Sequence, residues 1–172
     1  MKTIIKSHGG AAALLTGPES IKIGAVVSIS DIDCWRPTGL FDDESKLVLC
    51  LTFSDVIVGR HAPQKSDIQE LIDILPTMIE KCERENKDIL VHCAGGICRS
   101  TASAFVAMCM KLPEGMEDVA IRQILEWRHI ADPNRRIVEL ADEILGRKGS
   151  MVKALEDVQD EINRRMRIEF DF

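Results

Sequence analysis

The chain has 172 residues, of which 45% are hydrophobic and 29% are charged. These values are typical of soluble globular proteins and exclude a disordered or collagen-like chain. The 22 basic and 28 acidic side chains give a net charge of −6, which disfavours a general nucleic-acid binder, because such a protein needs a basic face.

The length favours a single domain that covers residues 1–172. No apolar stretch approaches the 18 or so residues that a membrane span needs, and the N-terminus lacks the apolar core of a signal peptide. The six cysteines are scattered, which is typical of free thiols rather than of a disulfide framework. We therefore expect a cytoplasmic protein without a membrane partner, and the oligomeric state stays open.

The N-terminal half alternates short apolar runs with turns. Strands are predicted over residues 25–29 and 47–53, and the near-continuous apolar character of the second is typical of a strand buried on both faces. Residues 89–91 form a third apolar run, and residues 4–5 predict a short edge strand. Such runs, separated by helical patterns, are typical of a parallel sheet.

Apolar residues at helical spacing predict a helix that begins at Ser66 or Asp67, as N-cap, and extends to Cys82. Pro76 lies inside this pattern, so a kink or a break is expected there. Residues 101–112 are apolar almost all round, which predicts a buried helix.

The C-terminal third is helical throughout. Residues 116–130 predict an amphipathic helix, and the segment 132–134 ends it and caps the next helix, which stops at Gly146. A last helix is predicted from Ser150 through Ile162. The expected fold class is α/β, with a central, mostly parallel sheet of four or five strands flanked by helices on both sides.

The segment His92-Cys93-Ala94-Gly95-Gly96-Ile97-Cys98-Arg99-Ser100 connects the strand at 89–91 to the buried helix. A strand, a tight loop and a helix N-terminus in this order form a phosphate cradle, because loop N–H groups turn inward and the helix dipole adds positive charge. Gly95 and Gly96 are expected to permit backbone angles and a close approach that other residues resist.

Cys93 is the candidate nucleophile of this loop. The inward N–H groups, the helix dipole and the charge of Arg99 favour its thiolate, which is the reactive form of a cysteine. The planar guanidinium of Arg99 suits two phosphate oxygens at once. The hydroxyl of Ser100 is placed to hydrogen-bond the sulfur and to assist its departure in a second step.

This run resembles the signature loop of the cysteine-dependent protein tyrosine phosphatase superfamily, most of all its dual-specificity branch and the short bacterial tyrosine-phosphatase-like proteins. The resemblance implies a phosphatase fold and hydrolysis of phosphomonoesters through a cysteinyl-phosphate, without metal or other cofactor. It implies that His92 helps to hold the loop. The substrate is then a phosphorylated protein or a small phosphomonoester. The implied phosphate-binding residues are Ala94, Gly95, Gly96, Ile97, Cys98 and Arg99.

The resemblance also requires an acid that protonates the leaving oxygen, and three aspartates are candidates. Asp55 follows the strand at 47–53, which is the position of the acid in the superfamily. Asp67 is better explained as a helix cap. Asp132 precedes a proline downstream of the loop, as the acid does in the low-molecular-weight tyrosine phosphatases, although their chain order differs.

Other readings of the loop stay open. A protein that keeps the cradle but lacks a working acid is a phosphopeptide-binding module. A rhodanese-like or arsenate-reductase-like enzyme also uses a cysteine loop with an arginine, but Ser100 directly after Arg99 disfavours it. Cys98 motivates the hypothesis of a protective disulfide with Cys93 under oxidation. Arg128, Arg135 and Arg136 are candidates to flank the cleft, but a charged helix surface is the default explanation for them.

Overall fold

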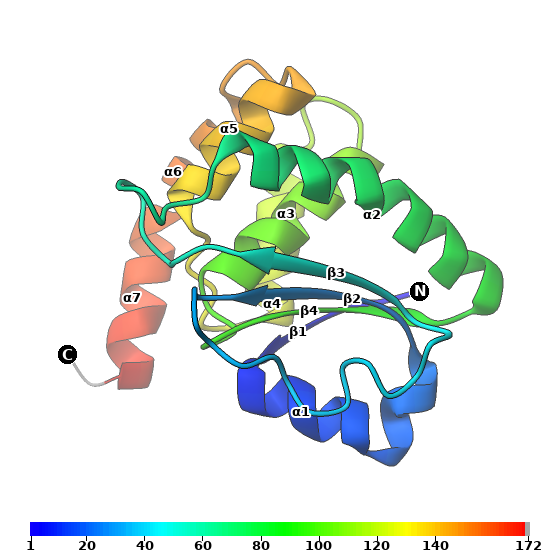
Figure 1. The fold of residues 1–172 in the computed structure, drawn as a ribbon. Coiled ribbons are helices and arrows are strands. Elements are labelled where there is room, and N and C mark those ends of the chain that lie inside the picture. Colours follow the sequence, from blue (N-terminus) through cyan, green and yellow to red (C-terminus); the bar gives the residue numbers. More distant parts are fainter. Residues whose placement is uncertain (171–172) are drawn as a thin grey trace.

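The computed structural model describes residues 1–170, and its centre is a four-stranded sheet (Figure 1). The strands are β1 (Thr3–Ser7), β2 (Ile23–Ser30), β3 (Leu47–Thr52) and β4 (Asp88–Cys93). Their order in the sheet is β1-β4-β2-β3, and all neighbours are parallel. The predicted α/β fold is confirmed, including the edge position of the first strand.

Seven α-helices and one 3-10 helix surround the sheet within the described residues. They are α1 (His8–Thr16), the 3-10 helix η1 (Pro18–Lys22), α2 (Lys65–Glu85), α3 (Arg99–Lys111), α4 (Glu117–Trp127), α5 (Arg135–Leu145), α6 (Ser150–Asp157) and α7 (Gln159–Phe170). Helix α1 covers one face of the sheet, and α2 and α3 cover the other (Figure 1). Every helix in residues 1–170 is too short or too polar to cross a bilayer.

The central strand β2 is buried along its whole length, because both faces of the sheet are covered. Ala25, Val27 and Ile29 point into the larger hydrophobic cluster beneath α2 and α3. Val26, between them, belongs to the smaller cluster on the α1 side. The alternation of side chains along a strand thus explains why β2 reads as a continuous apolar run.

Helix α2 differs from its prediction at two places. Its N-cap is Gln64 rather than Ser66 or Asp67, and the Asp67 carboxylate accepts the Gln64 amide at 2.7 Å in a capping box. The helix continues through Pro76 without a break. Pro76 lies on the exposed side of the helix, so its ring is not packed into the core.

The single C-terminal helix predicted from Ser150 through Ile162 is wrong, because the structure has two helices there. Helix α6 ends at Asp157, and the amide of Val158 bonds back to the Leu155 carbonyl at 3.3 Å, which tightens the chain into a turn. Helix α1 was not predicted at all. Its first turn contains two glycines, Gly9 and Gly10, and its stability comes from packing on the sheet rather than from intrinsic propensity.

The carboxyl ends of the parallel strands meet at one edge of the sheet. Three connecting segments leave this edge: residues 31–46 after β2, residues 53–64 after β3 and residues 94–98 after β4. In open parallel sheets such an edge is the usual place for a binding site.

Candidate functional site

Cys93 is the last residue of β4, and Arg99 opens α3 after the five-residue loop 94–98. The Cys93 side chain is 1% exposed and lies at the bottom of this loop. Its Sγ is 3.2 Å from Ser100 Oγ, within hydrogen-bond distance. The structure thus brings these two predicted site residues into direct contact.

The carbonyl groups of the loop are all fixed from outside it. Each carbonyl oxygen of residues 94–98 accepts a hydrogen bond: Ala94 from the His8 amide (3.0 Å), Gly95 and Gly96 from the Arg128 guanidinium (3.3 and 2.9 Å), Ile97 from the Asp132 amide (3.0 Å) and Cys98 from the Asn134 amide (3.2 Å). A trans peptide unit directs its N–H opposite to its carbonyl. The amides of residues 95–99, which share peptide units with these carbonyls, therefore face away from these anchors.

The amide groups of the loop form the other half of this pattern. Within residues 1–170, the N–H groups of residues 94–98 donate no hydrogen bond. The first N–H groups of α3 also lack helical acceptors, as at every helix N-terminus. A row of unpartnered donors at the start of a helix is a site for an anion.

Gly96 is the residue that the loop geometry requires. Its φ is +67°, and a Cβ there would lie 2.6 Å from the Lys6 carbonyl carbon and the Ser7 nitrogen at the end of β1. Gly95 differs from the expectation, since a Cβ there would meet only the side chain of Ile97 at 3.4 Å. Conformation and close approach therefore constrain Gly96, while Gly95 is constrained by neither.

Arg99 is 2% exposed and is held on two sides. Its Nη1 donates to the Phe53 carbonyl at 2.8 Å and its Nη2 to Asp31 Oδ2 at 2.9 Å. Its Nε is buried without a hydrogen-bond partner within the described residues, 3.7 Å from Asp55 Oδ2. Nη1 and Nη2 of the guanidinium are thus anchored, and Nε remains as a donor for another acceptor.

Asp55, the first candidate for the acid, lies beside Arg99, just after β3. Its Oδ1 accepts a hydrogen bond from Asn134 Nδ2 at 2.8 Å. The same asparagine caps α5, because its Oδ1 accepts the Ile137 amide at 3.3 Å. Asn134 therefore connects the carboxylate to the N-terminus of a helix.

The other two candidate acids have different surroundings. Asp67 is engaged in the capping box of α2. Asp132 lies close to the loop, and burial, followed by the charge of Asp55, raises the pKa of its carboxyl group. Of the two, only Asp132 lines a cavity together with Asp55 and Cys98, of about 260 Å³.

Cys98 is half-buried beside these carboxyl groups. Burial raises the pKa of its thiol, and the negative charges of Asp55 and Asp132 add to the effect. The thiol therefore stays protonated at neutral pH. The disulfide between Cys93 and Cys98 remains a hypothesis, and both are free thiols in this structure.

His92 is buried beside Ser28 and His8, and its role in holding the loop remains a prediction. Its Nε2 lies 2.8 Å from Ser28 Oγ on β2, and its ring meets that of His8 edge-on at 6.2 Å between centroids. Burial lowers the pKa of His92 to about 4, and the positive charges of His8 and Arg36 act in the same direction. The imidazole is therefore neutral at pH 7.

Three residues of this edge were missed by sequence reasoning. Asp31 follows β2 as Asp55 follows β3, so its place at the end of a buried strand was a usable signal. Arg128 was assigned to a helix surface and Asn134 only to a cap, and no local pattern shows that both reach across to the loop and to Asp55. Among residues 1–170, no three His, Cys, Asp or Glu side chains are grouped to hold a metal ion.

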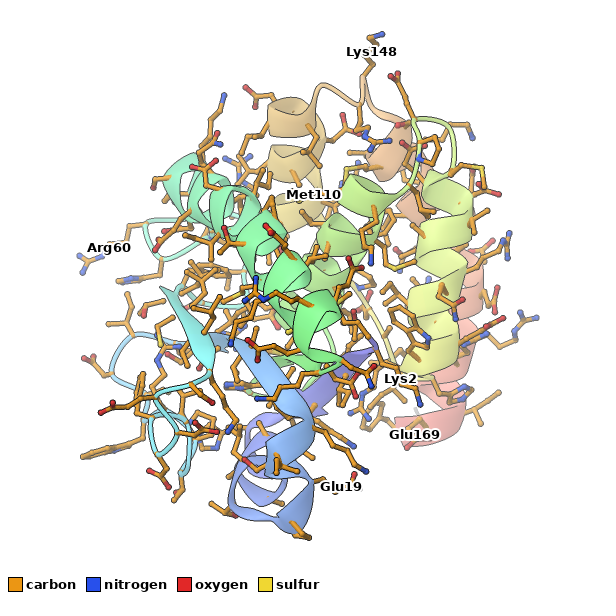
Figure 2. The ribbon with its side chains drawn as sticks, turned by 90° about the vertical axis from the view of Figure 1, so that its right-hand side faces the viewer. Lys2, Glu19, Arg60, Met110, Lys148 and Glu169 are labelled. Atoms are coloured by element: carbon orange, nitrogen blue, oxygen red, sulfur yellow. The ribbon has the colours of Figure 1, made fainter. Side chains whose placement is uncertain are left out.

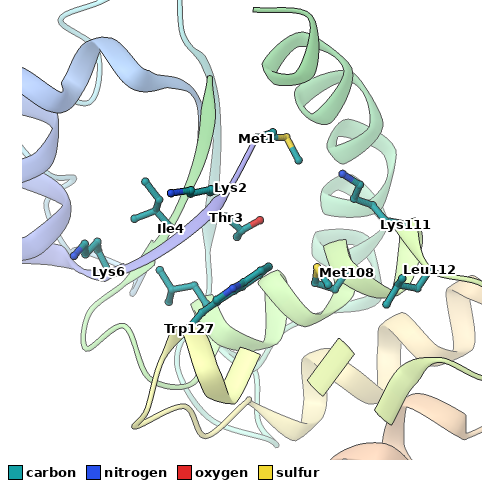
Figure 3. Close-up of a pocket in the computed structure, with 10 residues that line it drawn as sticks. Met1, Lys2, Thr3, Ile4, Lys6, Met108, Lys111, Leu112 and Trp127 are labelled. Carbon is teal, nitrogen blue, oxygen red and sulfur yellow. The ribbon is translucent and has the colours of Figure 1, made fainter. Parts of the chain in front are cut away.

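Another cavity lies away from these residues. It has a volume of about 660 Å³ and lies beside β1, where Trp127 and Met108 face the strand (Figure 3). Arg60, in the loop after Asp55, also lies outside the site, because its side chain points away from the molecule (Figure 2).

Comparison with known proteins places this fold in one class. No family model matches the chain, and no curated protein does. Among solved structures, Tk-PTP in its active form is 22% identical, with a TM-score of 0.60, over 83% of this chain and 90% of its own. DUSP15 is 21% identical, with a TM-score of 0.60, over 92% and 90%.

A third similar structure is the human tyrosine phosphatase-like serine/threonine/tyrosine-interacting protein. It is 18% identical, with a TM-score of 0.63, over 84% of this chain and 91% of its own. At these identities the likeness shows the fold. The chain has the fold of the tyrosine and dual-specificity phosphatases, as the resemblance of its loop implied.

Proposed function

We propose that this protein is a phosphatase of the tyrosine or dual-specificity type, which hydrolyses phosphomonoesters through a cysteinyl-phosphate. The observation that carries the proposal is the arrangement of loop 94–98. All five carbonyls are anchored outward, the amides are unpartnered, and the buried Nε of Arg99 lacks a partner beside them. These donors suit the equatorial oxygens of a phosphoryl group above Cys93.

In the first step, the thiolate of Cys93 attacks phosphorus in line with the ester oxygen. A sulfur–phosphorus bond forms as the phosphorus–oxygen bond breaks. The loop amides and Arg99 hold the charge of the transferring group, and the anchored side of the guanidinium keeps its fork in position. Asp55 gives its proton to the departing oxygen.

In the second step, water attacks phosphorus and Asp55 takes a proton from it. The phosphorus–sulfur bond breaks, and the thiolate returns with inorganic phosphate as the product. Ser100 Oγ, 3.2 Å from the sulfur, donates a hydrogen bond that stabilises the departing thiolate. Asn134 orients the Asp55 carboxylate in both steps.

The substrate class follows from the loop sequence. PTPMT1, a structural neighbour at 13% identity, has been crystallised with the phosphoinositide PI(5)P. Positions 94–97 of this chain are Ala, Gly, Gly and Ile, so these positions offer no lysine to a highly charged inositol headgroup. The substrate we propose is a phosphorylated protein or a small phosphomonoester.

Hydrolysis of p-nitrophenyl phosphate and of phenyl phosphate by the wild type, Cys93→Ser and Asp55→Asn tests the proposal. Cys93→Ser should abolish turnover of both esters. Asp55→Asn should lower kcat by about 10² or more on phenyl phosphate, whose leaving group needs a proton, and by less on p-nitrophenyl phosphate.

Asp67→Asn is the matched control, because Asp67 is a nearby aspartate in the chain that belongs to the capping box of α2. It should leave kcat unchanged on both esters. Full activity of Cys93→Ser would refute the mechanism, and an undiminished Asp55→Asn rate would transfer the role of the acid to Asp132.

A phosphopeptide-binding module is the second candidate, and one observation favours it. Cys93 is 1% exposed and Arg99 is already paired with Asp31. A thiol with so little accessible surface favours binding of phosphate by the loop amides over attack on phosphorus. Phosphopeptide binding by the wild type without release of phosphate would establish this reading over the enzyme.

A further inference from the structure

Strand β1 lies at an edge of the sheet and pairs only with β4 within the described residues. Residues 1–6 line the cavity of about 660 Å³ along this edge (Figure 3). Across the cavity lie Met108, Leu112 and Trp127, which we call the apolar wall. The indole of Trp127 is 41% exposed. The free edge of β1 therefore borders a groove whose opposite side is apolar.

The backbone groups of β1 are directed outward at alternate residues. The Ile89 amide donates to the Lys2 carbonyl at 3.0 Å, and in a parallel ladder the residues that bond to one neighbouring strand alternate along the chain. Ile4 therefore turns its backbone groups to β4 as Lys2 does. Thr3 and Ile5 direct their N–H and C=O groups to the free edge. Unpaired groups of this kind are a template for another strand.

The side chains of β1 give the two faces of this edge different characters. Lys2, Ile4 and Lys6 point to the side of α1, whereas Thr3 points to the side of the apolar wall (Figure 3). A strand added at this edge places its own side chains on the same two faces, at alternate positions. Every second residue of such a strand would meet the two lysines, and the residues between them would meet the apolar wall.

The charge of the groove is opposite to that of the whole protein. Three lysines and no acidic residue line the cavity, although the net charge of the chain is −6. Lys111 is already paired with Glu83 at 2.7 Å. Lys2 and Lys6 are exposed, and within residues 1–170 no acceptor binds their ammonium groups. The groove thus offers two free positive charges to an acidic ligand.

A second copy of the chain does not suit this edge. If two β1 strands paired antiparallel about Ile4, Lys2 of one copy would lie opposite Lys6 of the second copy, and like charges in that position destabilise a sheet. Lysines on edge strands prevent pairing of this kind in natural sheets. An acidic strand carries the opposite charge and gains from the same two side chains.

We propose that the edge of β1 binds an extended segment of a partner protein in which acidic and apolar residues alternate, and that this segment joins the sheet as a fifth strand. Main-chain hydrogen bonds to Thr3 and Ile5 provide affinity, while the lysines and the apolar wall select the sequence. Binding at this edge requires no phosphoryl transfer, so it can be tested separately from the proposed function.

Binding of labelled heptapeptides, measured by fluorescence anisotropy, tests the proposal. The probe is a peptide of alternating glutamate and valine. One control peptide has lysine in place of glutamate, and the other is the acidic peptide with every backbone nitrogen methylated, which keeps the charges but cannot donate to the strand. The probe should bind at least about 10-fold more tightly than either control. Absence of binding, or equal binding of a control, overturns the proposal.

Charge reversal on the protein locates the binding. Lys2→Glu with Lys6→Glu should weaken binding of the probe about 10-fold, because two attractions become repulsions. Lys148→Glu with Lys153→Glu, at two exposed lysines near the start of α6, makes the same change in net charge and should leave the affinity unchanged. Equal losses in the two double variants, at unchanged melting temperatures, would show general attraction of charge and overturn the proposal.

Amide hydrogen exchange gives a readout that needs no variant. At saturating probe, the amides of Thr3 and Ile5 should exchange about 10-fold more slowly or less, while the amide of Ile4, which already faces β4, should change little. Unchanged exchange at Thr3 and Ile5 would place the peptide elsewhere and overturn the proposal. Cys93→Ser should bind the probe as the wild type does, so a failed phosphatase assay and a failed peptide assay are distinguishable.

Discussion

Two neighbouring segments of the candidate site are built in opposite ways. Every carbonyl of the loop 94–98 is hydrogen-bonded to another part of the chain, and Gly96 fits against the end of β1 with no space for a side chain. The loop after β3, which carries Asp55, has the exposed apolar residues Val56, Ile57 and Val58 at its tip. Asp55 itself is held mainly by Asn134.

The contrast is between a preorganised loop, 94–98, and a loop that can adjust its position, the segment after β3. The loop 94–98, which we propose binds phosphate, is held in its shape by the fold, and preorganised donors act without reorganisation during reaction. The segment that carries Asp55, the proposed acid, depends on a single side-chain hydrogen bond and on Arg99. Substitutions in the loop 94–98 should therefore change stability strongly as well as chemistry, whereas those in the loop after β3 should change stability much less.

Arg99→Lys should have the largest effect of the substitutions that sharpen this contrast. A lysine cannot bind Asp31 and the Phe53 carbonyl while presenting a fork to phosphate. We expect kcat/KM for p-nitrophenyl phosphate to fall by about 10³, with a lower melting temperature. Arg60→Lys, in the exposed loop after Asp55, is the matched control and should change neither quantity.

Gly96→Ala against Gly59→Ala compares the two loops directly. Both glycines have positive φ, +67° and +105°, but a Cβ at Gly59 would meet nothing within 4 Å. We expect Gly96→Ala to lower the free energy of unfolding by about 3 kcal/mol and Gly59→Ala by about 1 kcal/mol. Equal losses in denaturant unfolding would show that the loop 94–98 is no more constrained than its neighbour.

The same contrast explains what the sequence could predict of the fold. The strands and buried helices were predicted because continuous apolar runs and helical spacing survive in the local sequence, as in β2 and α3. Helix α1 was missed because its two glycines weaken the local signal while packing on the sheet stabilises it. The turn at Val158 was missed because all the apolar residues around it keep helical spacing.

In the site, the loop 94–98 was recognisable because its chemistry is contiguous in the chain. Asp55 was recognisable by its position after an apolar strand. The prediction that this strand is buried on both faces is wrong, because β3 is an edge strand of the sheet with Cys50 and Thr52 exposed. Arg128 and Asn134 were not, because their roles depend on how the segment after α4 crosses the loop, a tertiary contact that leaves no trace in local spacing. The residues of the proposed phosphate-binding loop can therefore largely be predicted from the sequence, whereas Arg128 and Asn134, which support the site, cannot.

The buried His92, next to Cys93, makes the stability of the folded protein depend on pH. Burial, together with the charges of His8 and Arg36, lowers the pKa of His92 in the folded protein to about 4. In the unfolded chain the same side chain takes up a proton near pH 6.5, so between these two values only the unfolded chain is protonated. Stability present above pH 6.5 is therefore lost as the pH falls towards 4. Between pH 7 and pH 5 the loss from this group is roughly 2 kcal/mol.

Urea unfolding of the wild type and His92→Asn at pH 7 and pH 5 measures this contribution. The variant should lose roughly 2 kcal/mol less than the wild type over the interval, because its side chain does not titrate. His129→Asn, at an exposed histidine, is the control for the removal of an imidazole. Parallel profiles for the wild type and His92→Asn would contradict the prediction.

Asn134→Ser should have the smallest effect, and it tests the hydrogen bond that holds Asp55 in the segment after β3. Serine still caps α5 by accepting the Ile137 amide, but it cannot donate to Asp55 as Asn134 Nδ2 does at 2.8 Å. We expect kcat on phenyl phosphate to fall about 5- to 10-fold, in keeping with the loss of one hydrogen bond to a charged group. On p-nitrophenyl phosphate, which needs less help from the acid, kcat should be nearly unchanged.

The split between the two esters distinguishes orientation of Asp55 from mere structural support. Asn134→Ala loses the cap as well, so it should add about 1 kcal/mol of destabilisation to the same kinetic change. The backbone N–H of Asn134 also donates to the Cys98 carbonyl of the loop 94–98. If Asn134→Ser lowers kcat equally on both esters, Asn134 supports this loop as well as Asp55. The two halves of the site are then coupled through this residue rather than independent.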